Sequence, residues 1–180
     1  MVNNQITKEQ LVDILDRFLF GWEYKDIERA SVYGEAKLAG FILGCCFIDA
    51  MAGFYGGIDK KSAKKNSGKK NSGRRFCDFV GEYLPEYDKN KLWEDLRCGL
   101  VHSYAEGGAY VFTDNNKSGF HFNKTAKGKI ILNLEDFCAD LREAYTNFRN
   151  DILTRNSVFL RAKQRYESMG LMGLVGANNA

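Results

Sequence analysis

Arg97, His102 and Tyr104 follow one another in the order R-x4-H-x-Y. A neutral histidine near its ordinary pKa can take a proton from a ribose 2′-hydroxyl or return one to a leaving 5′-oxygen. An arginine supplies forked donors for the charge that develops on a phosphate, and a tyrosine can position a phosphate or a base. These residue types therefore suit cleavage of RNA, and the chemistry needs neither a metal ion nor another cofactor.

A regular helix would not place all three side chains on one face. Residues five apart on an α-helix are rotated by about 140°, whereas residues seven apart nearly eclipse one another. Arg97 would therefore share a face with Tyr104 and not with His102. For Arg97 and His102 to act on one phosphate, the helix must end or kink near Gly99, or the two groups must come from different subunits.

Residues 96–104 resemble the signature of the HEPN superfamily, all-helical proteins of which many are metal-independent ribonucleases in toxin-antitoxin, defence and RNA-processing systems. The R-x4-H-x-Y form is most similar to that of the HepT-type toxins. This resemblance implies a homodimer in which two motifs meet in an interface cleft, with Arg97 and His102 as the catalytic pair. It also implies that Tyr104 is the tyrosine modified by a nucleotidyltransferase antitoxin. Cys98 stands where nucleases of the superfamily usually carry a polar residue, so the alternative is a non-catalytic HEPN-like module that binds RNA, a nucleotide or a partner protein.

A purely structural interpretation of the same residues stays open. Arg97 could be a surface or ion-paired side chain, and His102 could simply be favoured by the dipole at a helix C-terminus. Asp49 stands in an apolar helical stretch and needs a partner if it is buried, and Arg97 is the attractive candidate. The other histidine, His121, lies on a predicted strand between two phenylalanines; we expect it to be exposed and assign it no role.

The formal net charge of +3 is unevenly distributed, because basic side chains are concentrated between residues 60 and 75. Residues 59–73 contain almost nothing apolar to bury, and they predict a mobile loop. The loop is either a solvated surface segment or an arm that contacts RNA phosphates. The residues predicted to bind RNA are Lys64, Lys65, Lys69, Lys70, Arg74 and Arg75.

Apolar periodicity predicts a mainly α-helical fold, a HEPN-like bundle with a small antiparallel β-meander inserted before the C-terminal helix. The predicted meander spans residues 109–132, and residues 169–180 are expected to form a flexible tail. The predicted helices cover residues 7–22, 31–57, 74–84, 89–104 and 133–152, with a continuation of the last to residue 166. Thr7, Ser31 and Asn133 are the predicted N-caps of the first, second and last helix. Trp22 belongs to the predicted inner stripe of the first helix. The inner stripes predicted for the last two helices contain these residues: Leu92, Trp93, Leu96 and Leu100 in the fourth, and Phe137, Leu141, Tyr145, Phe148 and Ile152 in the fifth. With 180 residues, the chain is expected to form a single domain, residues 1–180.

Five cysteines without metal-ligand spacing, and an N-terminus without a secretory signal, predict reduced thiols and a cytoplasmic protein. The apolar run from Leu38 ends at Asp49, short of the roughly 20 residues that a bilayer requires, so we expect a core helix and no membrane partner. Gly40 and Gly44 in that run indicate close backbone approach by another helix or by a second subunit, or else they have no packing role.

Overall fold

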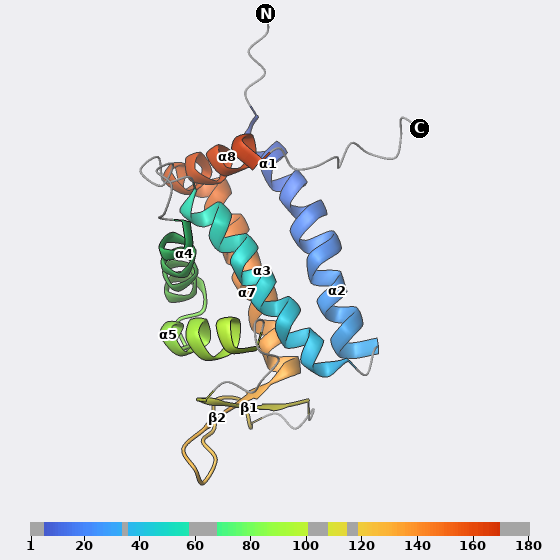
Figure 1. Ribbon diagram of the computed structural model, residues 1–180. Coiled ribbons are helices and arrows are strands. Elements are labelled where there is room, and N and C mark those ends of the chain that lie inside the picture. The colour runs from blue at the N-terminus through green and yellow to red at the C-terminus, as the bar shows by residue number, and fades with distance from the viewer. Residues whose placement is uncertain (1–5, 34–35, 58–67, 101–107, 115–118, 170–180) are drawn as a thin grey trace, which may run out of the picture.

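The fold is built around α3 (Lys37–Gly56), a helix that is apolar on nearly every side. Such a helix has to be surrounded by other elements. In the computed structural model, which describes residues 6–33, 36–57, 68–100, 108–114 and 119–169, α3 contacts α4 (Gly68–Tyr83), α7 (Leu134–Thr154) and α8 (Asn156–Met169) (Figure 1). The predicted mainly helical character is confirmed.

By length and composition, α3 is the one helix within the described ranges that could cross a membrane. Its buried side chains, which include Phe41, Phe47 and Met51, instead belong to the hydrophobic core shared with the surrounding helices. The predicted core helix is confirmed.

The N-terminal helix begins where the sequence predicts. Thr7 Oγ1 accepts a hydrogen bond from Gln10 N, and Gln10 Oε1 accepts one from Thr7 N, which completes a capping box. The helical run consists of α1 (Lys8–Leu15), the π-helical segment η1 (Asp16–Tyr24), α2 (Lys25–Glu28) and η2 (Arg29–Tyr33). Trp22, expected on the inner stripe, is 59% exposed, because the wider π-helical turn rotates it away from the face set by a 3.6-residue period.

The start of α3 differs from the sequence prediction. Ser31 was expected to cap this helix, but its Oγ donates a hydrogen bond to the carbonyl oxygen of Ile27, 2.7 Å away, inside the preceding helical run. The helix α3 begins six residues later, at Lys37, after Ala36. A serine near a helix end can bond back to its own turn as readily as cap the next helix.

Gly40 and Gly44 allow α7 to approach α3 closely. A Cβ atom at Gly44 would lie 2.5 Å from Cε1 of Phe137, and one at Gly40 would lie 3.1 Å from Cδ1 of Leu134. Of the possibilities left open by the sequence, the close approach comes from a helix of the same chain.

The helix α7 is capped as predicted, because Asn133 Oδ1 accepts a hydrogen bond from Asp136 N at 3.1 Å. Its expected inner stripe is buried: Phe137, Leu141, Tyr145, Phe148 and Ile152. The predicted continuation to residue 166 is wrong as one helix. Arg155 adopts an extended conformation (φ −101°, ψ 103°), and α8 begins at Asn156.

The predicted loop over residues 59–73 is partly helical, so the prediction is wrong for residues 68–73. The helix α4 begins at Gly68, before the expected start at Arg74, and it ends just before Pro85 as predicted. Gly73 packs against Trp93, since a Cβ atom there would lie 2.8 Å from Cε2 of the indole. This tertiary contact supports a turn whose sequence alone has little helical character. Residues 58–67 of the predicted loop, and 170–180 of the predicted tail, lie outside the described residues.

The helix that carries the motif begins with α5 (Lys89–Lys91), capped by Asp88, and continues as the π-helical η4 (Leu92–Leu100). Of its predicted inner residues, Leu92, Leu96 and Leu100 are buried in the core, and Trp93 is partly buried against it. Because these residues define the inner face of the helix, they also fix the position of Arg97 relative to that face. The remainder of the predicted helix, residues 101–104, lies outside the described residues.

The antiparallel β-meander was predicted wrongly. The strands β1 (Tyr110–Thr113) and β2 (Ile130–Asn133) pair directly and in parallel, with Tyr110 opposite Ile130. The middle segment joins β2 in antiparallel fashion through one bridge, Lys124 to Ile130. Phe122 explains the difference, because its φ of 64° is left-handed and interrupts an extended strand.

Candidate functional site

Arg97 of the R-x4-H-x-Y motif forms an ion pair with Asp49 of α3. Its Nε and one terminal nitrogen, Nη2, each lie 2.7 Å from the same carboxylate oxygen, Oδ2. The two side chains are only 24% and 25% exposed. The suggested pairing of Asp49 with Arg97 is confirmed, and it ties η4 to the central helix.

Trp93, one turn before Arg97, supports the guanidinium from a second side. The guanidinium carbon lies 5.0 Å from the centre of the indole ring, which is a cation-π contact. The indole packs in turn on Phe76, with the ring centres 5.2 Å apart. Burial lowers the pKa of Arg97, whereas the hydrogen bond and the charge of Asp49 raise it, and the net shift is upward. Arg97 is thus a fixed positive charge.

A pocket of about 270 Å³ opens beside this ion pair, and three arginines line it. Arg97 comes from η4, Arg75 from α4 and Arg165 from α8. Asp49 is the one carboxylate in the lining, so the lining residues carry two net positive charges. We call this cavity the arginine pocket; its charge suits an anion.

Arg97, which was predicted to be catalytic, and Arg75, which was predicted to bind RNA, line the same pocket. The structure does not bring Arg74 to the same place: its side chain is 83% exposed, and its Nε lies 3.6 Å from Asp78 Oδ2. Successive residues on a helix point in different directions, which separates Arg74 from Arg75. The other predicted site residues, His102, Tyr104, Lys64 and Lys65, lie outside the described residues, as do the side chains of Lys69 and Lys70 in the first turns of α4.

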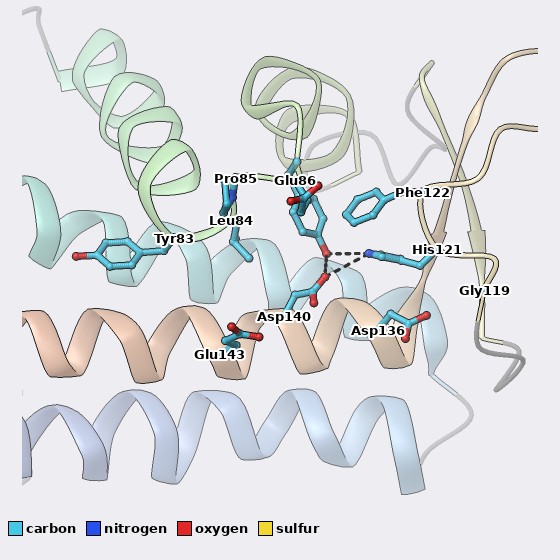
Figure 2. Close-up of a pocket in the computed structure, with 11 residues that line it drawn as sticks. Tyr83, Leu84, Pro85, Glu86, Gly119, His121, Phe122, Asp136, Asp140 and Glu143 are labelled. Atoms are coloured by element: carbon cyan, nitrogen blue, oxygen red, sulfur yellow. Dashed lines mark hydrogen bonds and ion pairs between the residues drawn. The ribbon is translucent and has the colours of Figure 1, made fainter.

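His121 is not the exposed strand residue that the sequence suggested. Its side chain is 11% exposed, and its Nε2 lies 3.1 Å from Tyr87 Oη and 3.3 Å from Asp140 Oδ2. Tyr87 donates its hydroxyl hydrogen to Asp140 Oδ2 at 2.6 Å. Figure 2 shows His121 and Asp140 pointing toward one another from the β-containing segment and from α7. No motif spacing joins these three segments, so sequence reasoning missed the cluster.

The hydrogen bonds of His121 fix its tautomer. The backbone N–H of Asn133 donates to Nδ1 at 3.1 Å, so that nitrogen carries the lone pair. The proton of a neutral imidazole is therefore on Nε2, where it faces Tyr87 and Asp140. Burial and the nearby Asp140 carboxylate raise the pKa of Tyr87 well above its ordinary value. This network joins β2, α7 and the turn after α4, and it engages both ring nitrogens of His121.

A pocket of about 460 Å³ adjoins this network. Its lining contains four carboxylates: Glu86, Asp136, Asp140 and Glu143. Asp136 and Glu143 lie along α7 on either side of Asp140 (Figure 2). Over the part of the chain that the structure describes, no group of three or more His, Cys, Asp or Glu side chains is arranged to hold a metal ion. The arginine pocket is therefore the better candidate, because it contains a residue of the motif.

Comparisons of this chain with protein-family models, with curated proteins and with solved structures found no match. The resemblance to the HEPN superfamily therefore rests on the motif residues alone.

Proposed function

We propose that this chain is a HEPN-like ribonuclease that binds an RNA phosphodiester beside Arg97 and cleaves it without a metal ion. The observation that carries the proposal is that Arg97 and Arg75, one from the motif and one from the basic segment, line the same positively charged pocket. An arginine-lined pocket would bind the phosphates of RNA, and an R-x4-H motif would suit its cleavage, so RNA is the polyanion that fits both features.

In the proposed reaction, the ribose 2′-oxygen forms a bond to phosphorus while the bond from phosphorus to the 5′-oxygen breaks. His102 takes the hydroxyl proton, and a proton from an acid or from water ends on the 5′-oxygen. The products carry a 2′,3′-cyclic phosphate and a free 5′-hydroxyl. Arg97 stabilises the charge on the phosphoryl oxygens, and Tyr104 positions the phosphate or a base. Because Asp49 and Trp93 hold the guanidinium beforehand, it needs little reorganisation during the reaction.

We further propose that the chain acts as a homodimer, in which His102 of one copy can approach Arg97 of the other. A nucleotidyltransferase antitoxin that modifies Tyr104 is the proposed partner, and the cytoplasm is the proposed location. All five cysteines have free thiols, which suits a reducing compartment.

An RNA cleavage assay in EDTA tests the proposal. We expect the purified protein to cleave RNA under these conditions and His102→Ala to lose activity while keeping the thermal midpoint of the parent. A folded protein that leaves RNA intact would remove the enzymatic part of the proposal.

A non-catalytic module that binds RNA, a nucleotide or a partner protein is the second candidate, and one observation favours it. Two nitrogens of Arg97 are already bound to Asp49, as they would be for an arginine that joins two helices. In this case RNA affinity survives His102→Ala but weakens with Arg75→Gln. Arg74→Gln should leave affinity within about twofold, because that side chain is exposed and lies beside Asp78 rather than in the pocket.

A further inference from the structure

Arg165 belongs to no motif, yet its surroundings are unusual for an arginine. It comes from α8 and lines the arginine pocket. Its Nε is buried and has no hydrogen-bond partner among the described residues. A buried donor without a partner is costly, and arginine normally meets a carboxylate, a carbonyl or a phosphate. This unmet donor points to a missing acceptor.

The backbone of α3 makes room for Arg165 and for Arg75. A Cβ atom at Gly53 would lie 3.5 Å from Arg165 Nε, in contact with the guanidinium. A Cβ atom at Gly56 would lie 2.5 Å from Arg75 Cδ. The two glycines are three residues apart, so they share one face of the helix. Both arginines are therefore packed against the same short surface of α3.

Two like charges are held together at this surface. Neither Arg75 nor Arg165 forms an ion pair within the described ranges, and Asp49, the one carboxylate in the pocket, already pairs with Arg97. Burial and the charge of Arg75 both lower the pKa of Arg165. An anion between the two guanidinium groups would offset this repulsion and accept charge-assisted hydrogen bonds from them.

We propose that the arginine pocket is a phosphate-binding site in which Arg75 and Arg165 hold one phosphate group between them. The planar fork of an arginine matches two phosphate oxygens, which favours phosphate over a spherical anion such as chloride. Ser72 also lines the pocket and provides a hydroxyl. The phosphate could belong to RNA or to a free ion or nucleotide. RNA as its source rests on the proposed function, but the phosphate site itself does not require cleavage.

Binding of inorganic phosphate, measured by calorimetry at constant ionic strength, tests this site. We expect Arg165→Gln and Arg75→Gln each to weaken phosphate binding by about tenfold or more, the loss of one charged hydrogen bond. The matched control, Arg74→Gln, keeps the affinity of the parent because that side chain is exposed and lies beside Asp78. Arg165→Lys, which keeps the charge without the fork, should fall between the parent and Arg165→Gln.

A second arm identifies the source of the phosphate. A short RNA that competes with inorganic phosphate assigns the site to RNA, and a lack of competition assigns it to a free phosphate or nucleotide. Phosphate binding and RNA cleavage are measured separately, so a failure of cleavage and a failure of this site give different results. The inference is overturned if the parent protein binds no phosphate, or if Arg165→Gln and Arg75→Gln bind it as tightly as Arg74→Gln does. If Arg165→Gln does not fold, Arg75→Gln alone decides between these outcomes.

Discussion

Nε and Nη2 of Arg97 both lie 2.7 Å from Oδ2 of Asp49, so the arginine of the motif is fixed to the central helix before any ligand arrives. The pair joins η4 to α3 in a place where both side chains are largely buried. Arg97 is therefore a structural residue, because it links two helices, and also a positive charge that is held in place beside the arginine pocket.

Asp49→Asn tests the strength of this connection. Removing one partner leaves the other charge buried without compensation, so we expect a loss of about 2 to 3 kcal/mol in the free energy of unfolding. Urea denaturation measures it. Asp13 and Arg17 form an exposed pair one turn apart on the N-terminal helix, and Asp13→Asn should cost less than about 0.5 kcal/mol. Equal losses at the two positions would show that Asp49 and Arg97 do not form a buried pair in solution.

Gly44→Ala tests the close approach of α7 to α3. The added methyl group would lie 2.5 Å from Cε1 of the buried Phe137, so we expect a loss of about 1 to 3 kcal/mol despite the higher helix propensity of alanine. Gly81 of α4 is a matched control, because it is exposed and a methyl group there meets only the end of the Lys89 side chain at 3.8 Å. Gly81→Ala should stabilise the protein by up to about 1 kcal/mol. A stabilising Gly44→Ala would contradict the packing of these two helices.

Glu23 should make stability depend on pH. Burial raises the pKa of this carboxyl group from 4.5 to about 7. The folded protein therefore holds the proton more tightly than the unfolded chain, so this contribution is fully present below pH 4.5 and is lost as the pH rises to 7. We expect Glu23→Gln to gain on the order of 1 kcal/mol relative to the parent between pH 4.5 and pH 8. Thermal unfolding across this range measures the difference, and a constant difference would refute the buried carboxyl group.

Glu9 should affect the pH dependence of stability in the opposite direction to Glu23. Hydrogen bonds from its own backbone N–H and from Thr7 lower the pKa of this carboxyl group. Its contribution is present above the ordinary pKa and is lost as the pH falls, so Glu9→Gln should change the pH dependence only in the acid range.

Tyr87→Phe tests the network around His121. The change removes the hydroxyl that donates to Asp140 Oδ2 and meets His121 Nε2, so we expect a loss of about 1 to 2 kcal/mol in the free energy of unfolding. Tyr33 is 83% exposed, and Tyr33→Phe should change stability by less than about 0.5 kcal/mol. Similar small effects at both positions would mean that the network does not connect α7 to its neighbours.

Local patterns in this sequence predicted local structure well. The Thr7 and Asn133 caps, the buried stripe of α7 and the apolar helix α3 follow from residues within a few positions of each other. One long-range contact, between Asp49 and Arg97, could also be predicted, because a carboxylate in an apolar helix needs a cation.

Features that depend on distant segments could not be predicted. The parallel pairing of β1 with β2 depends on the left-handed conformation of Phe122, which is not a residue that favours it. His121 becomes buried only because Tyr87 and Asp140 arrive from other elements, and Arg165 reaches the arginine pocket only because α8 folds back over α3. The spacing of residues within one segment cannot predict such contacts between segments.

Cleavage of an RNA that carries a single 2′-deoxyribose at the preferred cleavage position measures the central claim most directly. We predict that in EDTA the parent protein cleaves the all-ribose RNA and leaves 2′,3′-cyclic phosphate ends. It should leave the substituted position intact, and His102→Ala should cleave neither RNA. Cleavage at the deoxy position, or equal cleavage by folded His102→Ala, would contradict attack by the 2′-hydroxyl with His102 as the base.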